Sequence, residues 1–530
     1  MTKKIYVFDS TLRDGAQAEG ISFSVKDKIK IVKALDQLGV DYIEAGNPGS
    51  NPKDLEFFEK IKDTSLQNSK LIAFGSTRRR DISVEEDKNI QSLLQAGTSA
   101  VAIFGKSWDF HVTNIINTTL KENLNMIRDT VAFFKNQGKE VIFDAEHFFD
   151  GYKANSAYAL KALQAAVDGG ADCLVLCETN GGMFPQEVYD ITQKVVESFS
   201  VPIGIHTHND GGMAVANSIM AIEAGAVHVQ GTYIGFGERS GNANLSTIIA
   251  NLQLKKRYSC ILEEQMVNLT PTARYIAEVA NINLDDKEPY VGRSAFAHKA
   301  GMHIDGVNKA SHSFEHVHPS SVGNERRLLM SEVAGRSTIL SKIQSISPNI
   351  TKEDPVVQKI MDRVKELEHR GYQFEGAEST FELIVRKQLG KYKPFFEIEY
   401  FKTIGEHPAK NSEFGSSAMI KISVDGKEEI SAAEGDGPVN ALDKALRRAL
   451  EVFYPELKEV YLTDYKVRVL DTKGATAAKV RVLIESTDGQ DIWTTVGVSA
   501  DIIEASLIAL VDSIEYKLLK NIEKKIQDYL

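Results

Sequence analysis

Two histidines separated by one residue, His206 and His208, are the sharpest chemical signal in the sequence. They end the apolar run that begins at Ile203, which predicts a β-strand. Side chains at positions i and i+2 of a strand point to the same face, so both imidazoles can approach one divalent metal ion. A lone histidine would more often be a buried structural residue. The spacing therefore predicts a metal site at the end of this strand.

A second pair of charged residues, Arg13 and Asp14, directly follows an apolar stretch near the N-terminus. A carboxylate beside a guanidinium stays ionised and can bind a metal ion, while the arginine can stabilise an oxyanion. A salt bridge within a turn is an equally good interpretation of these two residues alone. Together with the histidines, Asp14 and the amide oxygen of Asn242 would make a mixed nitrogen and oxygen site for Zn²⁺, Mn²⁺ or Mg²⁺. Such a site suits a chelating α-keto acid.

Glu146 is a candidate for proton transfer because it stands among Phe143, Phe148 and Phe149 in the sequence. A carboxyl group surrounded by aromatic rings is easier to protonate than one in water. A helix cap or a structural carboxylate is the alternative. The run Arg78-Arg79-Arg80 could contact a phosphorylated cofactor, but a run of charges is more often solvated, and we assign it no role.

Up to about residue 256 the sequence alternates between strand-like and helix-like segments. Eight apolar runs predict strands: 5–11, 42–45, 71–75, 100–104, 140–145, 173–177, 203–208 and 227–231. Several intervening helices end at a glycine, as at Gly39, Gly97, Gly138 and Gly225. Eight such units in about 250 residues predict a closed (β/α)₈ TIM barrel. An open doubly wound sheet usually carries a Gly-x-Gly-x-x-Gly turn after its first strand, and this sequence has none there.

The candidate residues follow the predicted strands, where the working residues of a TIM barrel lie. Solvated charges without a function would fall at both strand ends. The clustering at one end predicts an enzyme. The residues are Arg13 and Asp14 after the first strand, Glu44 at the second, Glu146 and His147 at the fifth, Glu178 and Thr179 at the sixth, His206 and His208 at the seventh, and Glu238, Arg239 and Asn242 after the eighth.

We predict three domains: a catalytic TIM barrel over 1–262, helical linker subdomains over 263–402, and a small α+β domain over 403–530. In the last domain, strands at 417–424, 462–470, 478–485 and 491–498 and helices at 438–453 and 500–521 form two strand-strand-helix units. This domain carries no chemical constellation, so a regulatory or oligomerisation role is the better hypothesis.

The composition excludes some classes of function. The formal net charge is −11, which argues against broad nucleic-acid binding. The chain starts without an apolar signal segment and has no apolar run long enough to span a bilayer, so we expect a cytoplasmic protein that does not bind membranes. Cys173, Cys177 and Cys260 are too few for a disulfide framework, and we predict buried thiols.

Three motifs resemble the signatures of the isopropylmalate, homocitrate and citramalate synthase family: 9–17 (DSTLRDGAQ), 206–210 (HTHND) and 237–242 (GERSGN). The segment 296–306 (FAHKAGMHIDG) is similar to the histidine motif of that family's linker, and 435–442 and 474–479 are similar to its regulatory domain. Segments 42–53, 143–151 and 374–382 most resemble the (R)-citramalate synthase branch. The resemblance covers nearly the full chain.

The resemblance implies an acyltransferase that performs a Claisen-type condensation of acetyl-CoA with pyruvate and hydrolyses the thioester, giving (R)-citramalate and CoA in isoleucine biosynthesis. It further implies a homodimer and inhibition of the enzyme by isoleucine bound to the C-terminal domain. The implied roles are metal binding by Asp14, His206, His208 and Asn242, alkoxide stabilisation by Arg13, substrate binding by Arg13, Glu44 and Thr179, and proton transfer by Glu146 and His303.

One position departs from the family pattern, because Phe314 stands where related synthases often have a tyrosine. Phenylalanine cannot donate a hydrogen bond, so either His312 or His316 takes over any such role, or the role is unnecessary. Three alternatives stay open: a 2-isopropylmalate synthase that uses 2-oxoisovalerate, a metal-dependent lyase with the same barrel, and a catalytically silent amino-acid sensor.

Overall fold

The computed structural model describes residues 2–62, 64–299, 301–329, 336–406, 415–470 and 478–528. Ala300 of the linker motif and residues 474–477 of the regulatory motif lie outside these ranges. The chain forms two compact units, Met1–Phe296 with Glu315–Arg326, and Ala297–Phe314 with Arg327–Leu530. In the described parts of the chain, no helix is long and apolar enough to cross a membrane.

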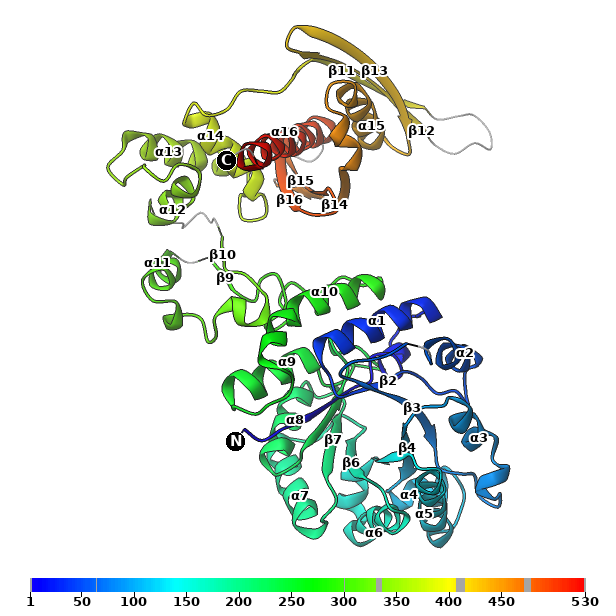
Figure 1. The fold of residues 1–530 in the computed structure, drawn as a ribbon. Helices are drawn as coiled ribbons and strands as arrows, with labels where there is room; N and C mark the ends of the chain where they lie inside the picture. Colours follow the sequence, from blue (N-terminus) through cyan, green and yellow to red (C-terminus); the bar gives the residue numbers. More distant parts are fainter. Residues whose placement is uncertain are drawn as a thin grey trace. The chain divides into compact units, whose positions relative to one another are not determined.

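The first unit contains a closed barrel of eight parallel strands in sequence order, which confirms the predicted fold class (Figure 1). β8 pairs with β1 and so closes the barrel. The strands are β1 (Tyr6–Asp9), β2 (Tyr42–Glu44), β3 (Lys70–Ser76), β4 (Ala100–Lys106), β5 (Glu140–Glu146), β6 (Cys173–Glu178), β7 (Ile203–Thr207) and β8 (His228–Gly231).

Helices surround this barrel, and their ends follow from the local sequence. Ser24 and Asp27 form a capping box at the start of α1, and the glycines predicted to end helices all have positive φ, for example 91° at Gly39. The helices are α1 (Val25–Leu38), α2 (Pro52–Ile61), α3 (Lys88–Gln95), α4 (Asp109–Asn114), α5 (Leu120–Asn136), α6 (Phe148–Gly169), α7 (Pro185–Ser198), α8 (Ala214–Glu223), α9 (Leu245–Ala250) and α10 (Leu269–Val279).

The barrel interior contains its own apolar cluster, which includes Phe8, Ile72 and Val175. The barrel is therefore a packed core and not a pore. Cys173 and Cys177 belong to this cluster, and Cys260 is also buried, which confirms the prediction of buried thiols. Burial raises the pKa of all three thiols, that of Cys260 to about 12, so these groups stay protonated at neutral pH.

The second unit starts with short elements and ends in two three-stranded antiparallel sheets, each followed by a helix. Its elements are β9 (Ala297–His298), α11 (Gly301–Lys309), β10 (Arg327–Leu328), α12 (Arg336–Ile346), α13 (Pro355–Arg370), α14 (Glu378–Gln388), β11 (Glu397–Glu406), β12 (Gly415–Val424), β13 (Lys427–Gly435), α15 (Pro438–Glu451), β14 (Tyr461–Val469), β15 (Val480–Thr487), β16 (Ile492–Ser499) and α16 (Ile502–Asp528).

The prediction of two strand-strand-helix units is wrong, because each unit has three strands before its helix. The sequence analysis missed β11 and β13, which are the outer strands of the first sheet and are rich in charged residues. The turn at Asp425 and Gly426, with φ of 46° and 80°, is a hairpin signal that could have revealed β13. The predicted domain boundaries at 262 and 402 stay predictions.

Candidate active site

Three side chains predicted to bind a metal lie together at the C-terminal mouth of the barrel. Nε2 of His206 is 3.2 Å from Nε2 of His208 and 3.5 Å from Oδ2 of Asp14. One ligand atom from each residue lies within 4.8 Å of the others, and all three residues are buried. Asp14 follows β1 while the histidines end β7, so the closed barrel brings together residues about 190 positions apart.

Asn242 completes this cluster. Its amide nitrogen donates to Oδ1 of Asp14 at 3.0 Å, and its backbone pairs with that of His208. Within the described residues, the amide oxygen of Asn242 is buried without a hydrogen-bond partner. A buried acceptor without a donor is costly, and a cation would satisfy it.

The protonation states of the cluster suit metal binding. Burial lowers the pKa of His206 to about 3 and also lowers the pKa of His208, so both imidazoles are neutral at pH 7. Burial would raise the pKa of Asp14, but Arg13 and the two histidines outweigh it and hold this pKa well below its usual range. Two neutral imidazoles and a carboxylate are the forms that bind a divalent cation. The residues therefore fit the predicted metal.

Arg13 is a fixed cation at the same site. Its Nε donates to Oε2 of Glu44 at 2.6 Å and its Nη1 donates to Oδ2 of Asp14 at 3.0 Å. The guanidinium lies 3.7 Å from the centroid of the Phe74 ring. Burial disfavours the charged form, but the carboxylates of Glu44 and Asp14 outweigh it and raise the pKa of Arg13. These contacts use two of the five N–H groups of the guanidinium and leave the others for a ligand.

Glu44, predicted to bind substrate, lies beneath Arg13 and is fully buried. It accepts hydrogen bonds from Arg13 and from the Ser10 hydroxyl, and it is not part of the lining of the cavity described next. Its contacts fix the guanidinium in place.

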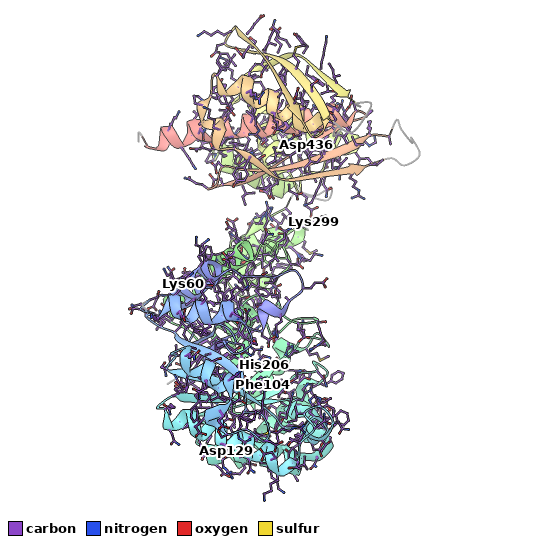
Figure 2. All side chains as sticks on the ribbon, turned by 90° about the vertical axis from the view of Figure 1, so that its right-hand side faces the viewer. Lys60, Phe104, Asp129, His206, Lys299 and Asp436 are labelled. Carbon is purple, nitrogen blue, oxygen red and sulfur yellow. The ribbon has the colours of Figure 1, made fainter. Side chains whose placement is uncertain are left out.

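A cavity of about 230 Å³ opens at the mouth of the barrel beside the cluster. The rings of Phe74 and Phe104 stack with their centroids 5.2 Å apart and form part of its wall. Figure 2 labels Phe104 and His206, two of the lining residues, inside the first unit. Its lining consists of Arg13, Asp14, Gln17, Phe74, Phe104, Asp144, Glu146, Cys177, Thr179, His206, His208, Glu238 and Arg239.

Two further predicted residues line this cavity. The Thr179 hydroxyl oxygen accepts from the His147 backbone N–H at 3.0 Å, so its own proton is free to bind another acceptor. Glu146 forms an ion pair with Lys106 through the register of β4 and β5. Sequence reasoning missed Lys106, although it ends its strand as the other site residues do.

Sequence reasoning also missed Phe74, Phe104, Asp144 and Gln230. Each lies in the second half of a barrel strand, so its position along the strand was a usable signal. Phe74, Phe104 and Gln230 carry no charge, and Asp144 lies two residues before the end of its strand, so charges at the strand ends did not reveal them.

The linker histidines belong to both compact units. His303 is exposed on α11 of the second unit, and its ring centroid is 4.4 Å from that of Phe314. His312 is exposed in the same unit, whereas His316 belongs to the first unit and packs against Tyr290 and Phe296. The predicted proton role of His303 stays a prediction.

The arginine run after β3 has a structural role at its first position. Arg78 is buried and forms ion pairs with Glu122 at 2.8 Å and Asp129 at 2.9 Å. Its charge is thus neutralised within the protein. Arg79 and Arg80 are exposed.

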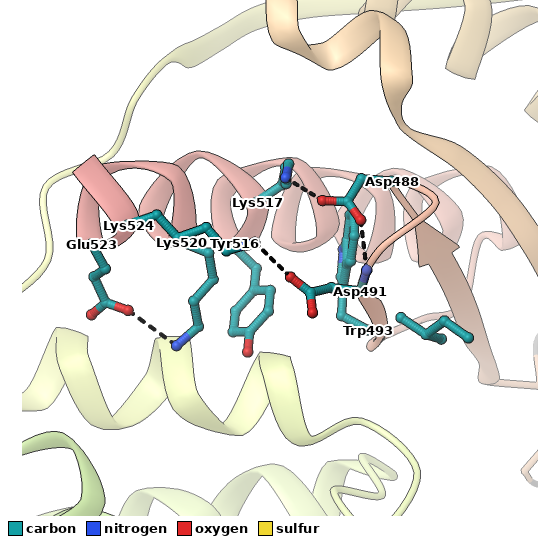
Figure 3. Close-up of a pocket in the computed structure, with 9 residues that line it drawn as sticks. Asp488, Asp491, Trp493, Tyr516, Lys517, Lys520, Glu523 and Lys524 are labelled. Carbon is teal, nitrogen blue, oxygen red and sulfur yellow. Dashed lines mark hydrogen bonds and ion pairs between the residues drawn. The ribbon is translucent and has the colours of Figure 1, made fainter. Parts of the chain in front are cut away.

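A larger cavity of about 370 Å³ lies in the second unit between α16 and the β15–β16 turn (Figure 3). Its charged side chains neutralise one another, because Lys517 pairs with Asp488 and Lys524 pairs with Asp491. Lys520 likewise pairs with Glu523 at 3.1 Å. This cavity has no converging metal ligands in the described residues, so the barrel mouth remains the candidate active site.

Comparison with known proteins covers almost the whole chain. Residues 4–276 match the HMGL-like family, residues 290–372 match the homocitrate synthase post-HMGL domain-like family, and residues 375–518 match the LeuA allosteric (dimerisation) domain. An (R)-citramalate synthase of Aquifex aeolicus is 52% identical, over 99% of this chain and 100% of that protein.

Other relatives separate the branches of the family. An (R)-citramalate synthase of Geobacter sulfurreducens is 50% identical over 98% of both chains. A probable 2-isopropylmalate synthase of Methanopyrus kandleri is 32% identical over 96% of this chain and 98% of that protein. With half of its sequence shared with citramalate synthases and a third with an isopropylmalate synthase, this chain is a member of the HMGL-like family, in its (R)-citramalate synthase branch.

Proposed function

We propose that this protein condenses acetyl-CoA with pyruvate and hydrolyses the thioester to release (R)-citramalate and CoA. The observation that supports this most directly is the pairing of a metal-ligand cluster with a fixed guanidinium at one small cavity. This arrangement suits a keto acid, because its two adjacent oxygens can chelate a metal while a cation meets the charge that develops on the keto oxygen.

Asp14, His206 and His208 would hold the metal, with the amide oxygen of Asn242 as a further ligand. A bound divalent ion would supply Lewis-acid polarisation of the keto oxygen. Two imidazole ligands favour Zn²⁺ or Mn²⁺ over Mg²⁺, which prefers oxygen ligands.

The aromatic wall of the cavity supports pyruvate as the keto acid. The stacked rings of Phe74 and Phe104 form part of that wall. We propose that these rings lie beside the side chain of the keto acid, where they would leave more room for a methyl group than for an isopropyl group.

The remaining residues would bind the keto-acid carboxylate, transfer protons or hold Arg13 in place. The free proton of the Thr179 hydroxyl would donate to the keto-acid carboxylate. Glu146, with Lys106 beside it, and His303 from the linker would share the two proton transfers. Glu44 would act through Arg13, by holding the guanidinium against the keto oxygen.

The proposed reaction has two steps, condensation and thioester hydrolysis. A base removes a proton from the acetyl methyl, the new carbon nucleophile attacks C2 of pyruvate, and the resulting alkoxide, stabilised by Arg13, takes up one proton. Water then attacks the thioester carbonyl and the thiol of CoA leaves with a proton. Glu146 and His303 are the groups we propose for these transfers.

The test is a panel of keto acids. Purified protein loaded with Zn²⁺ or Mn²⁺ is incubated with acetyl-CoA and pyruvate, 2-oxobutanoate, 2-oxoisovalerate or 2-oxoglutarate, and free CoA is followed with a thiol reagent. Pyruvate should give the highest kcat/KM. A preference for 2-oxoisovalerate would instead indicate an isopropylmalate synthase. Cleavage of a 3-hydroxyacyl-CoA into acetyl-CoA and a carbonyl compound, measured in a separate reaction, would indicate a lyase.

We further propose that the enzyme is a cytoplasmic homodimer, that His303 serves the barrel of the partner subunit, and that isoleucine inhibits through the C-terminal domain. Mixing Asp14→Ala and His303→Ala proteins should then restore activity that neither shows alone.

Deletion of residues 397–530, which removes β11 onward, should abolish any response to isoleucine while zinc binding persists. Inhibition that survives this deletion would contradict the regulatory proposal.

A further inference from the structure

His206 has a buried partner on the side away from the other proposed ligands. Its Nδ1 lies 3.0 Å from Oε1 of Gln230, which is fully buried and stands opposite His206 in the register of β7 and β8. Gln230 carries no charge and does not line the cavity at the barrel mouth. Within the described residues its side chain bonds to His206 and to Asp144.

The contact to Asp144 sets the direction of the Gln230 amide. Nε2 of Gln230 donates to Oδ1 of Asp144 at 3.0 Å, which leaves Oε1 to face His206. A carbonyl oxygen only accepts, so Nδ1 of His206 must carry the proton. The lone pair is then on Nε2, the atom that faces Asp14 and His208.

We propose that Gln230 and Asp144 are positioning residues that hold His206 in the tautomer able to bind the metal. The inference rests on the proposed metal site but not on the identity of the keto acid. It extends the metal site to β5, a strand that neither carries nor directly precedes any of the proposed metal ligands.

The physical need for such a device follows from the two nitrogens of the imidazole ring. A metal-binding imidazole carries its one proton on either nitrogen, so the contact at Nδ1 decides whether Nε2 keeps its lone pair. A reversed Gln230 amide would present its NH₂ to Nδ1 and so favour a proton on Nε2, where it blocks metal binding. Burial raises the pKa of Asp144 to about 8, and a neutral carboxyl still keeps a carbonyl oxygen that accepts from the amide.

The experiment measures zinc affinity of the metal-free, full-length protein by competition with a chromophoric chelator, without any substrate. Gln230→Leu should bind Zn²⁺ about 10–100-fold more weakly than wild type, the usual effect of losing such a partner. Gln230→Glu keeps an acceptor for Nδ1 and should stay within about threefold of wild type. Asn217→Leu is the matched control, because it removes another buried amide, bonded to Met183, that does not touch His206.

Thermal unfolding of each metal-free variant separates folding from binding, and Gln230→Met, closer in length to glutamine, replaces Gln230→Leu if that variant does not fold. Wild-type affinity in the folded variant, or equal weakness of the Leu and Glu variants, would overturn the inference. Asp14→Ala tests the metal site itself. If Asp14→Ala keeps wild-type zinc affinity, the proposed site is wrong. If Asp14→Ala loses zinc affinity while Gln230→Leu keeps it, only the positioning role is refuted.

Discussion

Replacement of Arg13 by lysine should isolate its proposed contribution to the transition state. The guanidinium binds Glu44 through Nε and Asp14 through Nη1 while its face packs on Phe74. Lysine keeps the positive charge but concentrates it at one nitrogen, so it cannot keep both carboxylate contacts and also reach the keto oxygen.

The expected effect is the loss of one preorganised donor to the developing oxyanion, about 2.7–4 kcal/mol or a 10²–10³-fold decrease in kcat. The folded protein should survive, because the lysine still neutralises the buried carboxylates of Glu44 and Asp14. Alanine at this position would leave them unpaired, at a cost of about 3–5 kcal/mol. Lysine is therefore the more informative substitution.

The assay is the release of CoA at saturating pyruvate and acetyl-CoA, with zinc content and melting temperature measured on the same samples. Arg239→Lys is the matched control, because this half-exposed arginine lines the same cavity but binds Asp210 and the Thr179 carbonyl. It should lose less than about tenfold. An Arg13→Lys protein with full zinc content and a kcat within threefold of wild type would refute the role of Arg13.

Three further predictions follow from the geometry. Phe104→Ala should shift the ratio of the kcat/KM values for 2-oxoisovalerate and pyruvate by about 10–200-fold in favour of the larger acid. Phe110 is exposed, so Phe110→Ala should leave this ratio unchanged. Gly181→Ala should destabilise the protein by about 1–3 kcal/mol in urea unfolding, because φ of Gly181 is 67° and an added Cβ would clash with Oδ2 of Asp210. Gly182 has open space around it, so Gly182→Ala should change stability by under about 0.5 kcal/mol. Equal effects of the two substitutions would contradict the argument. His228 is buried with its pKa lowered to about 3, so the unfolded chain binds a proton below pH 6.5 that the folded chain refuses, and stability is lost as pH falls from 6.5 towards 3. His228→Gln should reduce this loss by up to about 1.4 kcal/mol per pH unit in denaturant titrations at pH 7 and 5, while the exposed His318→Gln should not.

Much of the catalytic half could be predicted from the sequence because its signals are local. The His206-x-His208 spacing, the apolar runs and the helix-ending glycines each depend on a few neighbouring residues. They predicted the barrel, and they predicted that the candidate metal ligands lie together. The same reasoning failed for β11 and β13, because charged outer strands lack the apolar alternation that reveals a strand.

Local sequence thus determined which residue types stand at the strand ends, while tertiary structure alone decided their partners. The pairing of Lys106 with Glu146, the packing of Phe74 beneath Arg13 and the line from Asp144 through Gln230 to His206 all join different strands. Such contacts depend on strand register and on closure of the barrel, which bring residues from distant parts of the chain within hydrogen-bond distance. Arg13 and Asp14 illustrate both levels: their order in the sequence predicted a cation beside a carboxylate, and only the fold set Glu44 beneath the first and two histidines against the second.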